Sequence, residues 1–156
     1  ADCIIYSKTE NHNTPVIHTE FQPFIKVNPI NSSLLRTLMK YNVSNYQKSQ
    51  PPDKPIFAFC GIAEPNSFIN SAKELYLKVE GRKFFHDHQE YTEAVIQKLS
   101  EQIRESSISH VVTTEKDMVK LPDFFLEEFE VYVIKIDVVF ENELIIKDKI
   151  QQLLLN

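Results

Sequence analysis

From residue 56 onward, short apolar runs alternate with segments of helical periodicity, and this alternation constrains the fold more than any other feature. Ile56–Cys60 is continuously apolar, as expected of a strand buried on both faces of a parallel sheet. Further strands are predicted over 76–85, 110–113 and 130–140. Because parallel strands need crossover connections, this order predicts βαβ units in a Rossmann-like α/β fold, with a mostly parallel sheet and flanking helices.

Helices are predicted between these strands. Pro65 suits the first position of one helix, and Thr92 can cap the next. A short helical turn over 117–121 is stopped by Pro122, and a final helix is predicted from about Leu144. Each segment would cover part of one face of the sheet.

The first 55 residues have a different pattern. Residues 1–30 are β-prone, but prolines interrupt them and confine them to edges or hairpins. Apolar side chains at helical spacing predict a helix over 33–41, and the polar, proline-rich stretch 42–55 is the best linker candidate. Because Ala1 replaces an initiator methionine and no signal-peptide pattern follows, we expect a piece of a longer protein.

Glycine content limits the chemistry of this chain. Gly61 and Gly81 are its only glycines among 156 residues, too few for a phosphate-cradling P-loop or a dinucleotide-binding glycine fingerprint. No stretch reaches the ~20 apolar residues of a membrane span. The net charge of −5 disfavours nucleic acid or an anionic membrane surface as the main partner. Cys3 and Cys60 lie in apolar runs and are expected to be buried, reduced thiols.

Polar residues gather where the predicted strands end. Gly61 follows the first strand of the alternating region, a polar loop over 85–92 follows the second, and residues 113–117 follow the third. The carboxyl ends of parallel strands lie at one edge of the sheet, where open α/β folds bind ligands. The three segments are therefore expected to meet around one site.

The loop over 85–92 contains Asp87 next to His88, a pair suited to proton transfer or charge stabilisation. His86 and His88 would share a face of an extended backbone, but zinc needs a third protein ligand, so we expect no metal site. A solvated loop followed by a helix cap is the alternative interpretation of this segment. Sequence adjacency alone does not decide between them.

The strand-to-helix turn after the third strand offers two hydroxyls, a cation and two carboxylates, from Thr113, Thr114, Glu115, Lys116 and Asp117. Such groups can hold a ribose or a phosphate oxygen. The alternative is an ordinary helix N-cap made by Thr114 or Asp117, with Lys116 in solvent. Phe124, Phe125 and Phe129 are predicted core residues.

Three segments, 56–65, 85–92 and 112–121, resemble in order and spacing the C-terminal half of tetraacyldisaccharide 4'-kinase, the lipid A 4'-kinase family of Gram-negative bacteria. The resemblance implies that residues 1–30 are the end of an N-terminal domain and a β-hairpin linker. Residues 31–156 would then form the C-terminal α/β domain. Three positions differ from the family pattern, because Gln89 replaces a second histidine and Ala63-Glu64 replaces Gly-Asn.

The family transfers the γ-phosphate of ATP, with Mg²⁺, to the 4'-hydroxyl of a lipid disaccharide 1-phosphate at the cytoplasmic face of the inner membrane. The resemblance implies catalytic roles for Asp87 and His88, and cofactor binding by Gly61 and residues 113–117. It also implies that the P-loop domain and the membrane contact belong to a missing N-terminal half. The fragment by itself is expected to be soluble, inactive and without a tightly bound cofactor.

Two other classes of function fit the same residues. One is a non-catalytic Rossmann-like module that binds a nucleotide or anion, or that serves interaction alone. The other is a free-standing small hydrolase or transferase using Asp87 and His88, which lacks an evident nucleophile on a strained turn.

Overall fold

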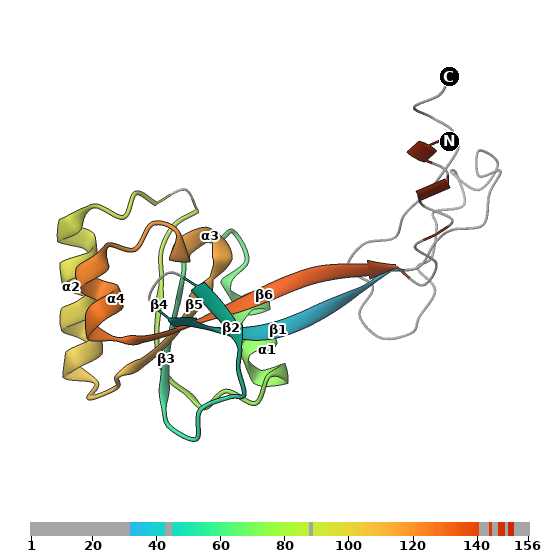
Figure 1. Cartoon of the computed structure of the whole chain (residues 1–156). Coiled ribbons are helices and arrows are strands. Elements are labelled where there is room, and N and C mark those ends of the chain that lie inside the picture. Colours follow the sequence, from blue (N-terminus) through green and yellow to red (C-terminus); the bar gives the residue numbers. More distant parts are fainter. Residues whose placement is uncertain are drawn as a thin grey trace. The chain divides into compact units, whose positions relative to one another are not determined.

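A computed structural model of the chain describes residues 32–42, 45–87 and 89–140, together with residues 144, 147, 148, 150 and 151 (Figure 1). The β-prone segments predicted over 1–30, Cys3 and His88 lie outside the described residues. The elements, in chain order, are β1 (Ser32–Asn42), β2 (Asn45–Lys48), β3 (Ile56–Cys60), α1 (Pro65–Glu74), β4 (Val79–Phe84), α2 (Glu93–Glu105), β5 (His110–Thr114), α3 (Glu115–Met118), α4 (Asp123–Glu128) and β6 (Glu130–Phe140).

The strands form one six-stranded sheet in the order β2-β1-β6-β5-β3-β4. The pairs β4–β3, β3–β5 and β5–β6 are parallel, and β1 with β2 forms an antiparallel hairpin. The predicted α/β class, with a mostly parallel sheet and flanking helices, is confirmed. An additional antiparallel hairpin forms the end of the sheet away from β4.

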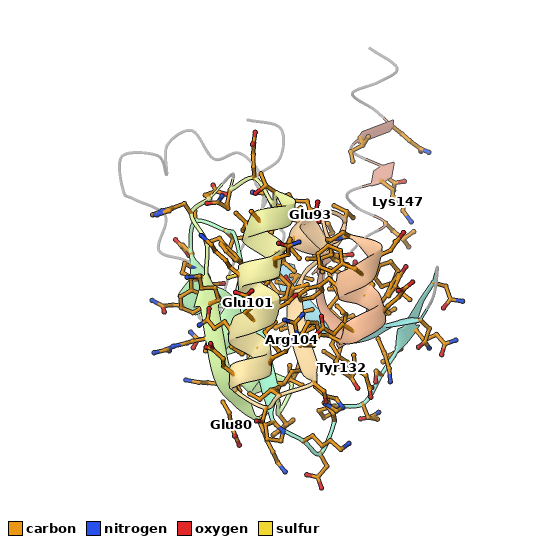
Figure 2. All side chains as sticks on the ribbon, turned by 90° about the vertical axis from the view of Figure 1, so that its left-hand side faces the viewer. Glu80, Glu93, Glu101, Arg104, Tyr132 and Lys147 are labelled. Carbon is orange, nitrogen blue, oxygen red and sulfur yellow. The ribbon has the colours of Figure 1, made fainter. Side chains whose placement is uncertain are left out.

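Helices cover both faces of the sheet, which explains why β3 is apolar throughout. Phe57 and Phe59 pack with buried residues of α2 and α4 on one face, whereas Ala58 and Cys60 pack with α1 on the other. Figure 2 looks onto α2 and α4, which lie side by side on the same face. Arg104 of α2 connects the two helices through Nε and Nη2, which donate to the carboxylate of Glu128 in α4 at 2.5 and 3.0 Å.

Gly81 allows the β3–β4 pair to pack under α2. A Cβ built on Gly81 would lie 2.3 Å from Cδ2 of Phe57, well inside van der Waals contact. The φ angle of Gly81 is not positive, so its role is close packing rather than an unusual backbone conformation. The edge strand therefore needs glycine at this position because a core phenylalanine ring occupies the space of a side chain.

The helix predicted over 33–41 is wrong, because this segment is strand β1. Leu38 packs into the core on the α1 face, while Met39 and Tyr41 pack on the α2 face. On the α1 face, Arg36 Nε also donates to Ser71 Oγ at 2.9 Å. Neighbouring residues thus have core contacts on opposite faces, which is the geometry of a strand, and the helical spacing was coincidental.

Other boundaries differ less. The predicted strand over 76–85 shortens to β4, the predicted linker over 42–55 contains β2, and α4 was not predicted. The strands predicted over 110–113 and 130–140 are confirmed as β5, one residue longer, and β6. Phe125 and Phe129 are core residues as predicted, but Phe124 is 38% exposed. In the final segment, where a helix was predicted from about Leu144, the described residues 144, 147, 148, 150 and 151 are helical. The other residues of 141–156 lie outside the described part of the chain.

The chain divides into two compact units, one formed by residues 36–135 and the other by residues 1–35 and 136–156. The candidate site described next lies entirely within the 36–135 unit. Among the described residues, no helix combines the length and apolar character that crossing a membrane requires.

Candidate functional site

Three strands end at the same edge of the sheet, and the segments that follow them are in contact. Cys60 at the end of β3 pairs with Phe84 at the end of β4, and the Phe85 N–H donates to the Cys60 carbonyl at 2.9 Å. On the other side of β3, strand β5 runs parallel and ends at Thr114. The turns that follow β4, β3 and β5 are therefore neighbours at the carboxyl edge of the sheet, as the sequence predicted.

Asp117 joins two of these turns. Its side chain is fully buried, and Oδ2 accepts hydrogen bonds from the Gly61 N–H at 2.9 Å and the Thr114 hydroxyl at 2.8 Å. The Asp117 N–H donates in turn to Thr114 Oγ1 at 3.2 Å, which caps helix α3. The alternative N-cap interpretation is thus correct for Thr114. We call the three residues Gly61, Thr114 and Asp117 the corner latch, since they fix the end of β3 to the end of β5.

The second oxygen of Asp117 faces an unusual group of neighbours. Among the described residues, neither Oδ1 nor the buried Tyr91 hydroxyl has a hydrogen-bond partner, and a Cβ on Gly61 would lie 3.3 and 3.0 Å from these two oxygens. Lys120 Nζ lies 3.7 Å from Oδ1 and 4.9 Å from the centre of the Tyr91 ring. The two oxygens thus occupy the space into which a side chain at position 61 would extend, and the Lys120 ammonium group lies close to one of them.

Burial and the Asp117 carboxylate keep the Tyr91 hydroxyl and the Cys60 thiol protonated. Burial raises the pKa of Tyr91 far above its usual range, and the nearby Asp117 carboxylate adds to the shift. Burial also raises the pKa of Cys60 to about 11, again with a contribution from Asp117. The Cys60 thiol is free and fully buried, so at neutral pH it has the character of a structural cysteine rather than a nucleophile.

Asp87 and Lys116 connect the remaining loop to the same edge. Lys116 Nζ lies 2.8 Å from Asp87 Oδ1, with the two side chains 45% and 36% exposed. This ion pair joins the loop after β4 to helix α3, across the width of β3. The residues that the sequence analysis placed at one edge are therefore in direct contact, whereas His88 lies outside the described residues.

The predicted cofactor-binding residues divide into two groups. Gly61, Thr114 and Asp117 bond to one another in the corner latch, so the Gly61 N–H and Thr114 hydroxyl are already engaged. Glu115 and Lys116 are exposed at the edge. Thr113 is fully buried, and its hydroxyl has no hydrogen-bond partner among the described residues.

Sequence reasoning missed two residues of this edge, Tyr91 and Lys120. Tyr91 lies within the polar loop over 85–92, but its sequence neighbours do not indicate that a lysine lies over its ring. Lys120 follows Asp117 by three residues, a spacing that places two side chains on one face of a helical turn. Within the described part of the chain, no group of three or more histidine, cysteine, aspartate or glutamate residues is placed to hold a metal ion.

Comparison with known proteins gives a consistent result over the whole chain. Residues 1–155 match the family model described as tetraacyldisaccharide-1-P 4'-kinase. The chain belongs to the tetraacyldisaccharide 4'-kinase family. The resemblance inferred from the three ordered motifs is therefore confirmed.

Individual members of the tetraacyldisaccharide 4'-kinase family cover different parts of the chain. The enzyme of Desulfotalea psychrophila is 36% identical over 74 residues, which are 47% of this chain and 21% of the relative. That of Leptospira biflexa is 27% identical over 172 aligned residues, covering 92% of this chain and 45% of the relative. The chain thus spans less than half the length of these relatives.

A solved structure shares the fold. The crystal structure of the family member LpxK from Aquifex aeolicus, in complex with ATP, matches 97% of this chain and 42% of its own, with a TM-score of 0.54 and 22% sequence identity. At this identity the match establishes the arrangement of the elements. The match therefore supports the α/β fold described above.

Proposed function

We propose that this chain provides the acceptor-activating half of a tetraacyldisaccharide 4'-kinase. In this proposal, Asp87 and His88 act at the 4'-hydroxyl of a lipid disaccharide 1-phosphate, and the phosphate-gripping P-loop belongs to an N-terminal domain that precedes residues 31–156. The observation that supports it most directly is the 2.8 Å contact between Lys116 and Asp87. That contact brings two motifs of the family together at the edge where α/β sheets bind ligands.

His88 is the proposed catalytic residue of this edge. An imidazole beside the acceptor hydroxyl can withdraw its proton as the oxygen attacks phosphorus, and the neighbouring Asp87 carboxylate favours the resulting imidazolium. Lys116 is a positioning residue, because its ammonium group holds Asp87 toward α3. Phosphoryl transfer depends mainly on positioning and charge stabilisation, so a rigid edge is valuable even though only one proton moves.

The corner latch makes this edge rigid. Asp117 fixes the end of β3 to the start of α3, and the Lys116 that contacts Asp87 is the residue directly before it. The donor at the edge that fits an ATP phosphate oxygen is therefore Lys116 rather than the Gly61 N–H, because its half-exposed ammonium group has further protons beside the one donated to Asp87. Bound ATP would supply the γ-phosphate, and Mg²⁺ would neutralise part of the phosphate charge.

The proposal also names the partners of the chain and its location in the cell. The partner of this chain is the P-loop domain, its substrate is the acylated disaccharide 1-phosphate, and no nucleic acid takes part. Contact with the cytoplasmic face of the inner membrane would come through the N-terminal half. The net charge of −5 supports this assignment, because an acidic chain is a poor ligand for an anionic bilayer.

The test compares the chain with and without a P-loop domain. The 156-residue chain alone is expected to transfer no phosphate from ATP to the lipid, and a kinase containing both halves is expected to be active. In that kinase, His88→Ala should lower kcat by about 10²–10⁴-fold, the usual range for a positioned acid–base group. His110→Ala, at the amino end of β5, is the matched control and should leave kcat within about twofold after its stability is checked. Turnover by the chain alone, or a fully active His88→Ala kinase, would contradict the proposal.

A further inference from the structure

A pocket beside the proposed catalytic loop has a composition that the site described so far does not use. It has a volume of about 310 Å³ and lies between the end of strand β4 and helix α2. Its apolar lining includes Phe85 and Val95, which are partly buried, and its polar lining includes Lys83, Lys98 and Gln89. The volume is at the lower end for small-molecule sites and suits part of a lipid rather than a whole one.

The two lysines give the pocket a positive rim. Lys83 Nζ lies 5.9 Å from the centre of the Phe85 ring, so its ammonium group is over the apolar floor. Lys98 makes no hydrogen bond or ion pair within the described part of the chain. No carboxylate is among the described residues that line the pocket, although the chain as a whole is acidic. A cationic rim over an aromatic floor is complementary to an anionic group attached to an apolar chain.

The pocket shares a wall with the catalytic loop. His86 and Gln89 both line it, and the Gln89 N–H donates to the His86 carbonyl at 3.0 Å, which connects the two sides of this loop. A ligand in the pocket would therefore lie within a few residues of the group that contacts Lys116. Figure 2 faces the side of the molecule on which α2 lies, with Glu93 and Glu101 marking its course.

We propose that this pocket binds an acyl chain and an adjoining phosphate of the acylated sugar phosphate that the kinase phosphorylates. The apolar floor takes methylene groups, and Lys83 and Lys98 take the phosphate. The identity of this ligand rests on the proposed function, whereas the existence of the site rests on the pocket. The pocket thus holds the substrate by groups that do not react, so that the acceptor hydroxyl is presented to the neighbouring loop.

Calorimetric titration of the 156-residue chain with three probes tests this proposal. The probes are glucosamine 1-phosphate carrying one N-linked lauroyl chain, the same acylated sugar without phosphate, and glucosamine 1-phosphate without the chain, all below micelle-forming concentrations. The complete probe should bind at least ~10-fold more tightly than either truncated one, since each lacks one of the two interactions. Equal binding of a truncated probe, or no binding of the complete one, would overturn the proposal.

Variants locate the binding. Lys83→Gln with Lys98→Gln should weaken the complete probe by about tenfold or more, because both charge-assisted contacts are lost. Lys48→Gln with Lys73→Gln changes the net charge equally on β2 and α1 and should leave its affinity unchanged. Equal loss in both double variants would show non-specific charge attraction and contradict the site. Thermal melts confirm that each variant is folded.

The readout also separates this proposal from the proposed function. Binding is measured without turnover, so an inactive kinase leaves the test of the pocket intact. Conversely, if His88→Ala abolishes turnover but the lysine variants bind as well as the unchanged chain, the catalytic assignment stands and the pocket is rejected.

Discussion

The two edges of the parallel sheet each carry a carboxylate network, and the two networks are built differently. At the carboxyl edge, Asp117 is fully buried and is held by a backbone N–H and a hydroxyl. At the amino edge, Glu130 is 47% exposed and is held by Lys40 at 2.5 Å, with His110 at 3.6 Å. The donors to Asp117 are a backbone N–H and a short side chain, whose positions are fixed. The donor to Glu130 is a long, flexible lysine side chain that is partly exposed to solvent.

This difference indicates what each edge contributes. Buried donors with fixed positions stabilise a single arrangement of the turns, and removing their acceptor leaves unpaired polar groups inside the protein. An exposed lysine–glutamate pair is screened by water and contributes little stability, typically less than ~1 kcal/mol. The carboxyl edge is therefore expected to be the more rigid of the two, which suits the proposed role of positioning reacting groups.

The largest contrast is expected from removing each carboxylate in turn. Asp117→Ala should lower the free energy of unfolding by about 3 kcal/mol, because the Gly61 N–H and the Thr114 hydroxyl lose their buried acceptor. Glu130→Ala is the matched control and should cost less than ~1 kcal/mol. Urea unfolding of the 156-residue chain measures both. Equal losses in the two variants would remove the distinction between the edges.

Crowding the corner latch should have a smaller effect. Gly61→Ala places a methyl group 3.0 Å from the Tyr91 hydroxyl and 3.3 Å from Asp117 Oδ1, so these groups must move apart. We expect a loss of about 1–2 kcal/mol in urea unfolding, as for other overpacked interiors. Glu64→Ala changes the same loop at a side chain that makes no capping hydrogen bond and should be nearly neutral. An unaffected Gly61→Ala variant would mean that the latch is looser than the structure shows.

The contribution of the exposed Lys40–Glu130 pair to the free energy of unfolding should depend on pH. The hydrogen bond from Lys40 lowers the pKa of Glu130 below its usual value of 4.5, so the pair stabilises the fold above that pH and the contribution is lost as acid protonates Glu130. The difference in unfolding free energy between the unchanged chain and Glu130→Gln should be below ~1 kcal/mol at pH 7 and should vanish at strongly acidic pH. A difference that grows on acidification has the wrong sign and would contradict the assignment.

Tyr91→Phe should have the smallest effect. The hydroxyl is buried and has no hydrogen-bond partner in the part of the chain that the structure describes, so its removal takes away an unsatisfied polar group while the ring keeps its edge-on contact with Phe85 at 5.1 Å. We expect unfolding free energies within ~0.5 kcal/mol of the unchanged chain, or a slight gain. Tyr91→Ala, which also removes the ring, should be clearly destabilising. A large loss in Tyr91→Phe would show that the hydroxyl does bond to Asp117.

The alternating part of the fold was predictable because its local patterns agree with its burial. Ile56–Cys60 is apolar at every position, and β3 is buried at every position, since helices cover both faces. Pro65 does begin α1, and Glu130–Phe140 does form β6. Strand β1 was not predictable from its own residues, because its conformation depends on pairing with β2 and β6 rather than on local preference.

The juxtaposition of the loops at this edge was predictable, but most of the contacts between them were not. The topology alone placed Asp87 and residues 113–117 at one edge, and the ion pair between Asp87 and Lys116 agrees with that placement. The burial of Asp117 was not foreseeable, because it depends on a turn 56 residues away in the sequence that presents the Gly61 N–H. The contribution of Tyr91 and Lys120 likewise depends on tertiary contacts.

The most direct test of the account is a paired turnover measurement on Lys116→Met and Lys40→Met in the kinase that contains this chain. Each variant removes one lysine from an exposed ion pair, at the carboxyl and amino edge respectively. Lys116→Met should lower kcat by about 10–100-fold, with an altered pH profile and largely restored activity in Lys116→Arg, since misplacement of Asp87 disturbs its neighbour. Lys40→Met should leave kcat unchanged. Equal kcat values for the two variants would contradict the claim that the carboxyl edge carries the chemistry.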